Sequence, residues 1–254
     1  MDPATGEVRE VSWSGQAGGF KACNLINNLS YCTKKLIDET PTKREKIIQE
    51  LILIVLTVLP ILYLGLNWSV LPESVPIHFD AKGEPNGYGS RFVYLILPLG
   101  SYLLMLVLPR IDPRKANYAV FEGSYYKLRL IMAVFFGVLN TTILWGIVHQ
   151  TNSVQRFLPI SLFFLFMLIG NYMGNFRPNY FVGIKVPWTL NSDEVWIRTH
   201  KMAGKLWFWC SLAGMALFFV VDKFEWIFIP LMIVLVVVPI VYSYVIYQQV
   251  EKKN

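Results

Sequence analysis

The chain has 254 residues, of which 54% are hydrophobic, 15% aromatic and 16% charged, and its formal net charge is +6. Soluble domains carry about 25% charged residues, so this composition excludes an ordinary soluble protein. The positive charge does not require a nucleic-acid partner, because Lys and Arg beside the cytoplasmic ends of membrane helices produce the same balance.

Residues 1–42 form a polar tail without an apolar core. We therefore expect no signal peptide, and a first membrane helix that acts as its own insertion signal. The tail is either native sequence or an addition to it. Three cysteines in the whole chain are too few for a disulfide framework.

Six apolar segments follow the tail, and a helix of about 20 apolar residues is enough to cross a bilayer. We predict an all-α polytopic membrane protein with about six transmembrane helices, at residues 47–66, 92–109, 129–149, 157–174, 204–221 and 226–247. Lys and Arg gather in alternate connections, which predicts that both termini are cytoplasmic. The second and fourth segments are short, at the lower limit for a membrane helix.

This pattern divides the chain into two membrane domains. Residues 43–110 form an N-terminal domain with a structured extracytoplasmic loop, 67–91, after its first helix. Residues 111–254 form a second domain with a cytoplasmic motif at 170–205.

The outer loop contains alternating apolar and polar residues from Val75 to Asp80, which predicts an extended segment. This spacing places His78 and Asp80 on one face, with Glu84 near the following turn. One interpretation is a metal or proton site, because Asp and His are common metal ligands and His titrates near neutral pH. The other interpretation, which we favour because two ligands are too few for a metal, is a structured lid whose His78 bonds a neighbour.

The segment 179–205 is too rich in specific residues for a simple connection. Asn191 is a favoured helix cap, and Glu194 at the third position completes a capping-box pattern, so we predict a helix that continues into the fifth membrane segment. Its apolar stripe and flanking cations indicate a basic amphipathic helix at the inner membrane surface. Trp188 and Trp196 fit an interfacial belt.

Three amides recur every four residues, at Asn171, Asn175 and Asn179. If the fourth helix continues that far, they share one face, and polar groups at membrane depth normally face protein or a water-filled cavity. A polar cavity between helices 4 and 5, with His200 nearby, is therefore one prediction. A plain lipid anchor without another partner is the alternative.

Two long motifs carry a family resemblance. Residues 71–91, "LPESVPIHFDAKGEPNGYGSR", resemble the short membrane-associated domain L-P-x-x-V-P-x-H-F-x-x-x-G-x-P-D-G that precedes the SdpI region in many bacterial proteins. Residues 170–206, "GNYMGNFRPNYFVGIKVPWTLNSDEVWIRTHKMAGKL", resemble the SdpI signature itself. The departures are small, with Asn86 where an acid is common and Lys185 where Arg is usual. The resemblance covers about residues 45–250.

The resemblance implies a multi-pass protein of the bacterial cytoplasmic membrane that gives immunity to a secreted membrane-active peptide toxin. Its expected partners are membrane lipid, the peptide toxin and a cytoplasmic transcriptional repressor held at the membrane, with no direct nucleic-acid contact, no metal and no cofactor. The candidate toxin-recognition residues are His78, Asp80, Glu84 and Asn86. The candidate residues of the cytoplasmic motif are Asn171, Asn175, Arg177, Asn179, Gly183, Lys185, Trp188, Thr189, Trp196, Thr199 and His200.

Two other functions remain open. A small-solute or lipid transporter would use the polar cavity between helices 4 and 5, but the centres of the predicted spans carry no ionisable residue of the kind that proton-coupled carriers use. An enzyme is the third alternative, and we expect none. No GxSxG, HExxH or paired-acid motif lies in a span, and Glu194 and His200 are too far apart along a helix to form an acid–base pair.

Overall fold

The computed structural model describes residues 41–80, 84–151, 153–221 and 225–252. Predictions for the polar tail up to residue 40 lie outside these residues. The chain divides after Thr42, and the unit that begins at Lys43 is the helical body of the protein.

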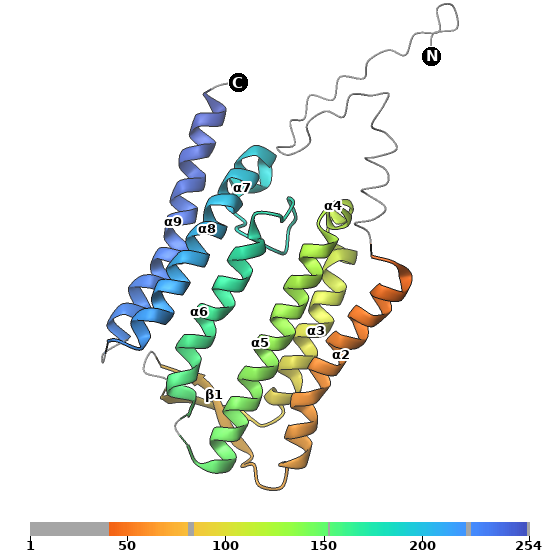
Figure 1. The fold of residues 1–254 in the computed structure, drawn as a ribbon, viewed down its shortest axis with the longest axis vertical. Helices are drawn as coiled ribbons and strands as arrows, with labels where there is room; N and C mark the ends of the chain where they lie inside the picture. The colour runs from red at the N-terminus through yellow and green to blue at the C-terminus, as the bar shows by residue number, and fades with distance from the viewer. Residues whose placement is uncertain (1–40, 81–83, 152, 222–224, 253–254) are drawn as a thin grey trace, which may run out of the picture. The chain divides into compact units, whose positions relative to one another are not determined.

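The described residues of this unit form an up-and-down arrangement of six long helices with two short ones and a β-hairpin (Figure 1). In chain order its elements are α2 (Lys43–Leu66), β1 (Ser74–Phe79), β2 (Pro85–Ser90), α3 (Val93–Ile111), α4 (Lys115–Val120), α5 (Glu122–His149), α6 (Ser153–Met173), α7 (Pro187–Asn191), α8 (Asp193–Phe218) and α9 (Glu225–Glu251). Each of the six predicted membrane segments overlaps one of the long helices, so their helical structure is confirmed, although the segment 204–221 extends beyond the end of α8 at Phe218.

The prediction of an all-α fold needs a correction, because the loop after α2 contains a two-stranded antiparallel sheet. The extended backbone expected from Val75 is found in β1, which pairs with β2 from Ser74↔Ser90 to Phe79↔Pro85. Figure 1 shows the hairpin at the end of the helical body opposite to α4 and α7.

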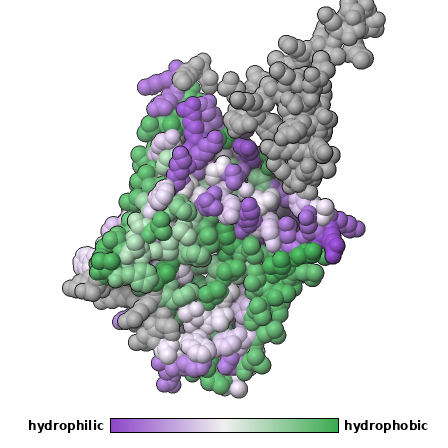
Figure 2. All heavy atoms as spheres, in the orientation of Figure 1, coloured by the Kyte–Doolittle hydropathy of each residue, from purple (hydrophilic) through white to green (hydrophobic). Residues whose placement is uncertain are grey.

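Among the described residues, four helices are long and apolar enough to cross a bilayer, namely α2, α3, α5 and α9. The apolar part of α6, Phe157–Met173, is shorter. Large apolar side chains remain exposed along these helices, including Leu62 at 56%, Ile96 at 63% and Val241 at 56%. Figure 2 shows this apolar band between more polar ends. Such extensive apolar exposure is unfavourable in water and suits lipid, so the chain is a multi-pass membrane protein.

The helices α6 and α8 pack closely because glycines face each other at their crossing. A Cβ on Gly170 would lie 2.8 Å from the carbonyl oxygen of Gly204, and a Cβ on Gly204 would lie 2.7 Å from the carbonyl oxygen of Gly170. Small residues allow this close approach of two helices within a bilayer. Further along α8, Gly214 accommodates the ring of Phe163.

Candidate functional site

The connection between α6 and α8 is a hydrogen-bonded loop centred on Asn179, which is fully buried. Its Oδ1 accepts hydrogen bonds from the backbone N–H groups of Phe181 and Val182, at 3.0 and 2.6 Å. Its Nδ2 donates to the carbonyl oxygens of Arg177 and Val182, at 2.8 and 3.0 Å. One amide side chain therefore satisfies four backbone groups of a turn that has no regular secondary structure.

His200 of α8 binds the next part of this loop, at Ile184. It is fully buried, its Nδ1–H donates to the carbonyl oxygen of Trp196 at 2.8 Å, and its Nε2 accepts from the backbone N–H of Ile184 at 3.0 Å. Both ring nitrogens are thus committed to the backbone in the neutral form. Burial lowers the pKa of His200, which precedes the predicted span at 204–221, to about 4.

Gly183 has a special place in this arrangement, because its φ is +114° and it lies directly against the His200 ring. A Cβ at this position would be 2.3 Å from His200 Nε2. The ring also stacks on Trp196, with centroids 4.0 Å apart, and Trp196 Nε1 donates to the carbonyl oxygen of Phe176 at 3.0 Å. These contacts leave no room for a side chain at residue 183.

The Pro-Trp-Thr-Leu segment forms α7 and joins the loop to α9. Thr189 Oγ1 accepts from the backbone N–H of Val186 at 3.1 Å, and it lies 2.8 Å from the carbonyl oxygen of Ile184. Trp188 Nε1 donates to Ser243 Oγ of α9 at 2.7 Å, and its ring packs against Tyr244. Trp188 therefore contacts protein on one side and is not solely a lipid anchor.

The residues that hold the loop from the other side come from α4 and from the connection between α3 and α4, and the sequence analysis missed them. Asp112 is 2% exposed, and its Oδ2 accepts from the backbone N–H of Tyr180 at 2.9 Å. Tyr118 OH lies 3.1 Å from Asp112 Oδ2 and 3.3 Å from Asn179 Oδ1. Asn117 Nδ2 donates to the carbonyl oxygen of Pro178 at 2.6 Å, and Arg114 donates to the carbonyl oxygen of Leu190 at 2.7 Å.

The predicted amide face of the fourth helix is not formed. The helix α6 ends at Met173, so Asn171 and Asn175 are exposed whereas Asn179 turns inward within the loop. The Gly170–Gly204 contact also brings the backbones of α6 and α8 together at the level where the polar cavity was expected. The three amides therefore do not line a common cavity between these helices.

The predicted start of α8 is wrong by one residue. Ser192 is the cap, with its Oγ accepting from the backbone N–H of Val195 at 3.4 Å, whereas Asn191 ends α7. Glu194 forms an ion pair with Arg198 at 2.6 Å instead of returning to the cap. The interfacial position predicted for Trp196 is also wrong, because its side chain is fully buried within the protein.

The remaining residues of the motif differ in exposure. Thr199 is fully buried, and its Oγ1 has no hydrogen-bond partner among the described residues. Lys185 is exposed and its Nζ donates to the carbonyl oxygen of Phe181 at 3.0 Å, and Arg177 is half-buried. The motif thus has an inward set of polar side chains that shape the loop and an outward set of cations.

The hairpin presents a different kind of surface. His78 and Asn86 are both exposed and lie across the two strands, with His78 Nδ1 2.5 Å from Asn86 Oδ1. Asp80 and Glu84 close the end of the hairpin, since Asp80 Oδ1 accepts from the backbone N–H of Glu84 at 2.9 Å. Within the described residues no group of three His, Cys, Asp or Glu side chains is placed to hold a metal ion. The hydrogen bond to a neighbouring side chain that we expect for His78 is present, and its partner is Asn86.

The hairpin is anchored to α3 and to the segment that follows α2. Val75 is fully buried, and the carbonyl oxygen of Pro76 accepts a hydrogen bond from Tyr94 OH. Arg91 donates to the carbonyl oxygens of Trp68 and Leu71, both at 3.1 Å, and its guanidinium lies 4.1 Å from the centre of the Trp68 ring. The exposed face of the hairpin is consequently held in a fixed position.

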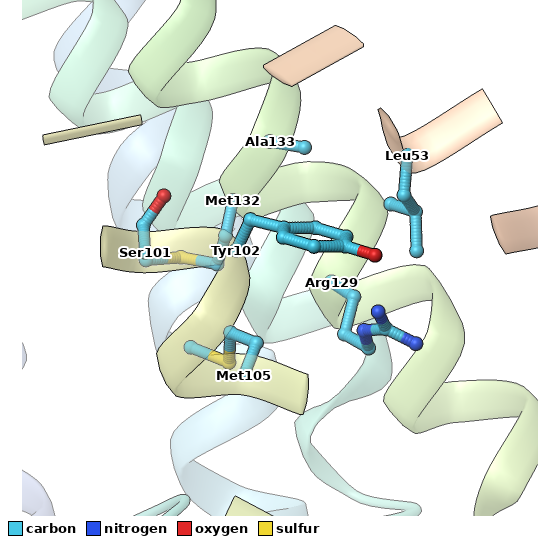
Figure 3. Close-up of a pocket in the computed structure, with 7 residues that line it drawn as sticks. All are labelled: Leu53, Ser101, Tyr102, Met105, Arg129, Met132 and Ala133. Carbon is cyan, nitrogen blue, oxygen red and sulfur yellow. The ribbon is translucent and has the colours of Figure 1, made fainter. Parts of the chain in front are cut away.

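A second polar cluster lies within the helices near α4, and it was not predicted. Glu50 of α2 accepts two hydrogen bonds from Arg129 of α5, at 2.9 and 2.8 Å, and one from Tyr102 OH of α3 at 2.6 Å. The cluster therefore ties three helices together. Figure 3 shows the Tyr102 hydroxyl between the side chains of Leu53 and Arg129. All three residues line a small cavity of about 10 Å³ beside the ion pair of Glu50 and Arg129.

Comparisons with known proteins agree with the two motifs. Residues 175–243 match the SdpI/YfhL protein family, and residues 55–100 match a domain of unknown function, DUF1648. The immunity protein SdpI of Bacillus subtilis (strain 168) is 24% identical over 199 residues, which cover 77% of this chain and 92% of that protein. An uncharacterized protein of Archaeoglobus fulgidus is 60% identical over 37 residues, or 15% of this chain and 20% of that protein. No solved structure matches the chain at a significant level. The predicted resemblance to the SdpI family is thus confirmed.

Proposed function

We propose that this chain, an SdpI-family sequence over residues 175–243, is an immunity protein that protects its cell against a membrane-active peptide toxin. The single observation that carries the proposal is the similarity to an immunity protein along nearly the whole length of that relative. The same similarity supports a location in the bacterial cytoplasmic membrane.

We propose a topology of six crossings with both termini in the cytoplasm. The concentration of Lys and Arg in alternate connections between the helices supports this topology. The position of the hairpin, at the end opposite to α4 and α7, supports it as well. In this topology the short α6 and the partly polar α8 cross as a closely packed pair that joins at Gly170 and Gly204.

Labelling of single cysteines tests this topology. In a background without native cysteines, Ser90→Cys in the hairpin should react with a membrane-impermeant maleimide in intact cells. Asn191→Cys at the end of α7 should react only after the cells are permeabilised. Equal labelling of both positions in intact cells would refute the proposed orientation.

We propose that the hairpin is the toxin-recognition surface. Its exposed side chains include apolar ones, Ile77 at 50% and Tyr88 at 60% exposure, and the polar pair His78 and Asn86. A membrane-active peptide is amphipathic, so a surface with both kinds of group complements it. The anchoring of the hairpin by Arg91 limits the entropy that binding would cost.

Expression in a toxin-sensitive bacterium tests recognition directly. The wild-type chain should raise the inhibitory concentration of the toxin against which the Bacillus subtilis relative gives immunity. His78→Ala should weaken protection about fivefold, since it removes one polar contact worth about 1 kcal/mol. Ser74→Ala, an exposed change at the start of β1, is the matched control. Equal protection by both variants, at equal membrane levels, would refute hairpin recognition.

We propose binding rather than catalysis at the cytoplasmic motif. His200 is the only histidine there, and its two nitrogens are occupied by the backbone at Trp196 and Ile184 in the described structure. A general base needs a free nitrogen within reach of its substrate. The outward cations of α8, including Lys201 and Lys205, instead favour an acidic partner surface.

We further propose that this partner is a transcriptional repressor held at the membrane. A DNA-binding protein encoded beside this chain's gene, fused to a fluorescent protein, should move to the membrane when toxin is added. The double substitution Lys201→Gln with Lys205→Gln should release it while protection against toxin persists. Movement that is unaffected by this double variant would contradict docking at α8.

A further inference from the structure

A cavity of about 520 Å³ lies among the N-terminal turns of α2 and α5, the C-terminal turns of α3, and α4. Five charged residues line it, namely Lys46, Glu50, Arg110, Glu122 and Arg129. A volume of this size is typical of a small-molecule site. The cavity is separate from the hairpin, and Tyr118, which also contacts Asn179 of the α6–α8 loop, is one of its lining residues.

The charges in the cavity do not balance. Glu122 pairs with Lys46 at 2.6 Å, and Glu50 pairs with Arg129 at 2.8 Å. The remaining cation, Arg110, donates to the carbonyl oxygen of Leu106 in its own helix, at 2.7 Å, and forms no ion pair within the described residues, although its charge also acts on the Glu50 carboxylate. The lining therefore carries one excess positive charge, at a guanidinium with most of its five N–H donors available.

Two further donors line the same cavity. The Gln49 amide and the Tyr126 hydroxyl make no side-chain hydrogen bond within the described part of the chain. They belong to α2 and α5, so with Arg110 they approach the cavity from three helices. A cluster of donors around one unpaired guanidinium suits a multivalent anion with several acceptor oxygens.

We propose that this cavity binds the phosphate group of an anionic ligand, with Arg110 as the charged contact and Gln49 and Tyr126 as hydrogen-bond donors. Arg binds phosphate with two parallel hydrogen bonds, which gives both energy and orientation. The phosphate belongs either to a lipid headgroup or to a soluble compound. Basic pockets between membrane helices on the cytoplasmic side suit anionic headgroups, and the cavity lies at the end of the helices that carries α4.

Two measurements on the purified full-length chain test the site and identify the source of the phosphate. Native mass spectrometry counts the phosphatidylglycerol and phosphatidylcholine molecules that the protein retains from mixed nanodiscs. Isothermal titration calorimetry with inorganic phosphate, in phosphatidylcholine nanodiscs, measures binding of the soluble anion. Selective retention of phosphatidylglycerol supports a headgroup site, and binding of inorganic phosphate supports a soluble ligand.

The variants decide whether the cavity is responsible. Arg110→Gln should weaken binding of the effective probe about tenfold, the expected loss of one charge-assisted contact, and Tyr126→Phe should weaken it about threefold. Arg198→Gln is the matched control, because this exposed cation pairs with Glu194 on α8 and does not line the cavity. The proposal is overturned if neither probe binds the wild-type chain, or if Arg198→Gln weakens binding as much as Arg110→Gln.

Discussion

Substitution of Gly183 by Ala should destabilise the α6–α8 loop strongly. Two costs add. Placing a Cβ at φ +114° costs about 1–3 kcal/mol in backbone strain. The new Cβ would also lie 2.3 Å from His200 Nε2, so the ring must move and the N–H of Ile184 loses its acceptor, at a further cost of about 1–3 kcal/mol. The expected total is roughly 4 kcal/mol.

Thermal unfolding in detergent, followed by tryptophan fluorescence, measures this effect. About 2–4 °C per kcal/mol is typical for a chain of this length, so the melting temperature should fall by about 10 °C. Gly123→Ala is the matched control at the start of α5. A Cβ there meets nothing within 4 Å, and Ala is the better helix former, so this variant should be neutral or slightly stabilising.

A double-mutant cycle separates the two costs of Gly183→Ala. In a His200→Ala background the ring is absent, so the additional cost of Gly183→Ala should fall to the backbone strain alone, about 1–3 kcal/mol. The reasoning is refuted if the melting temperature of Gly183→Ala lies within about 2 °C of that of Gly123→Ala, because a loss of 1 kcal/mol shifts the melting temperature by at least roughly that amount. It is equally refuted if the cost is the same with and without the His200 ring.

Three further predictions follow from contacts elsewhere in the helical body. Because the neutral His200 has a pKa of about 4 in the fold against 6.5 in the unfolded chain, stability should fall as pH drops from about 6.5 towards 4, and His200→Gln should lose that part of the pH profile of the melting temperature. Gly170→Ala should lower the melting temperature by forcing α6 from α8, whereas Gly174→Ala, whose Cβ would be 3.6 Å from its nearest neighbour, should not. Arg129→Gln should cost about 1–3 kcal/mol, because the partly exposed Glu50 carboxylate loses both hydrogen bonds from Arg129 and keeps the one from Tyr102, and adding Glu50→Gln should recover much of it in the same unfolding assay.

The helices and the first strand of the hairpin could be predicted because their signals are local. A run of apolar residues long enough for a bilayer determines a helix with little help from the rest of the chain. The alternation from Val75 likewise predicts one extended segment, which is β1. The sequence did not predict its partner, because Pro85, Asn86 and Gly87 are typical turn residues and yet belong to β2. The order and position of the helices and of β1 therefore follow from the sequence.

The internal structure of the α6–α8 loop could not be predicted, because it depends on distant residues. Asn179 continues a four-residue repeat in the sequence, and only contacts across 61 residues with Tyr118 and across 68 residues between Asp112 and Tyr180 show that it faces inward. The pair of Glu50 and Arg129 is separated by 79 residues. A single sequence does not show which residues so far apart along the chain come into contact. An Asp and an Arg beside the end of an apolar helix are, however, a general signal for buried polar contacts.

The division of the motif into inward and outward residues determines how its function can be tested. Asn179, Gly183, Trp196 and His200 contact the protein's own backbone or each other, so changing them alters the loop before it alters any partner. Loss of immunity in such variants would therefore report misfolding as readily as lost binding. The residues that can contact the proposed partner without supporting the loop are exposed cations such as Lys201, and substitutions there separate recognition from folding.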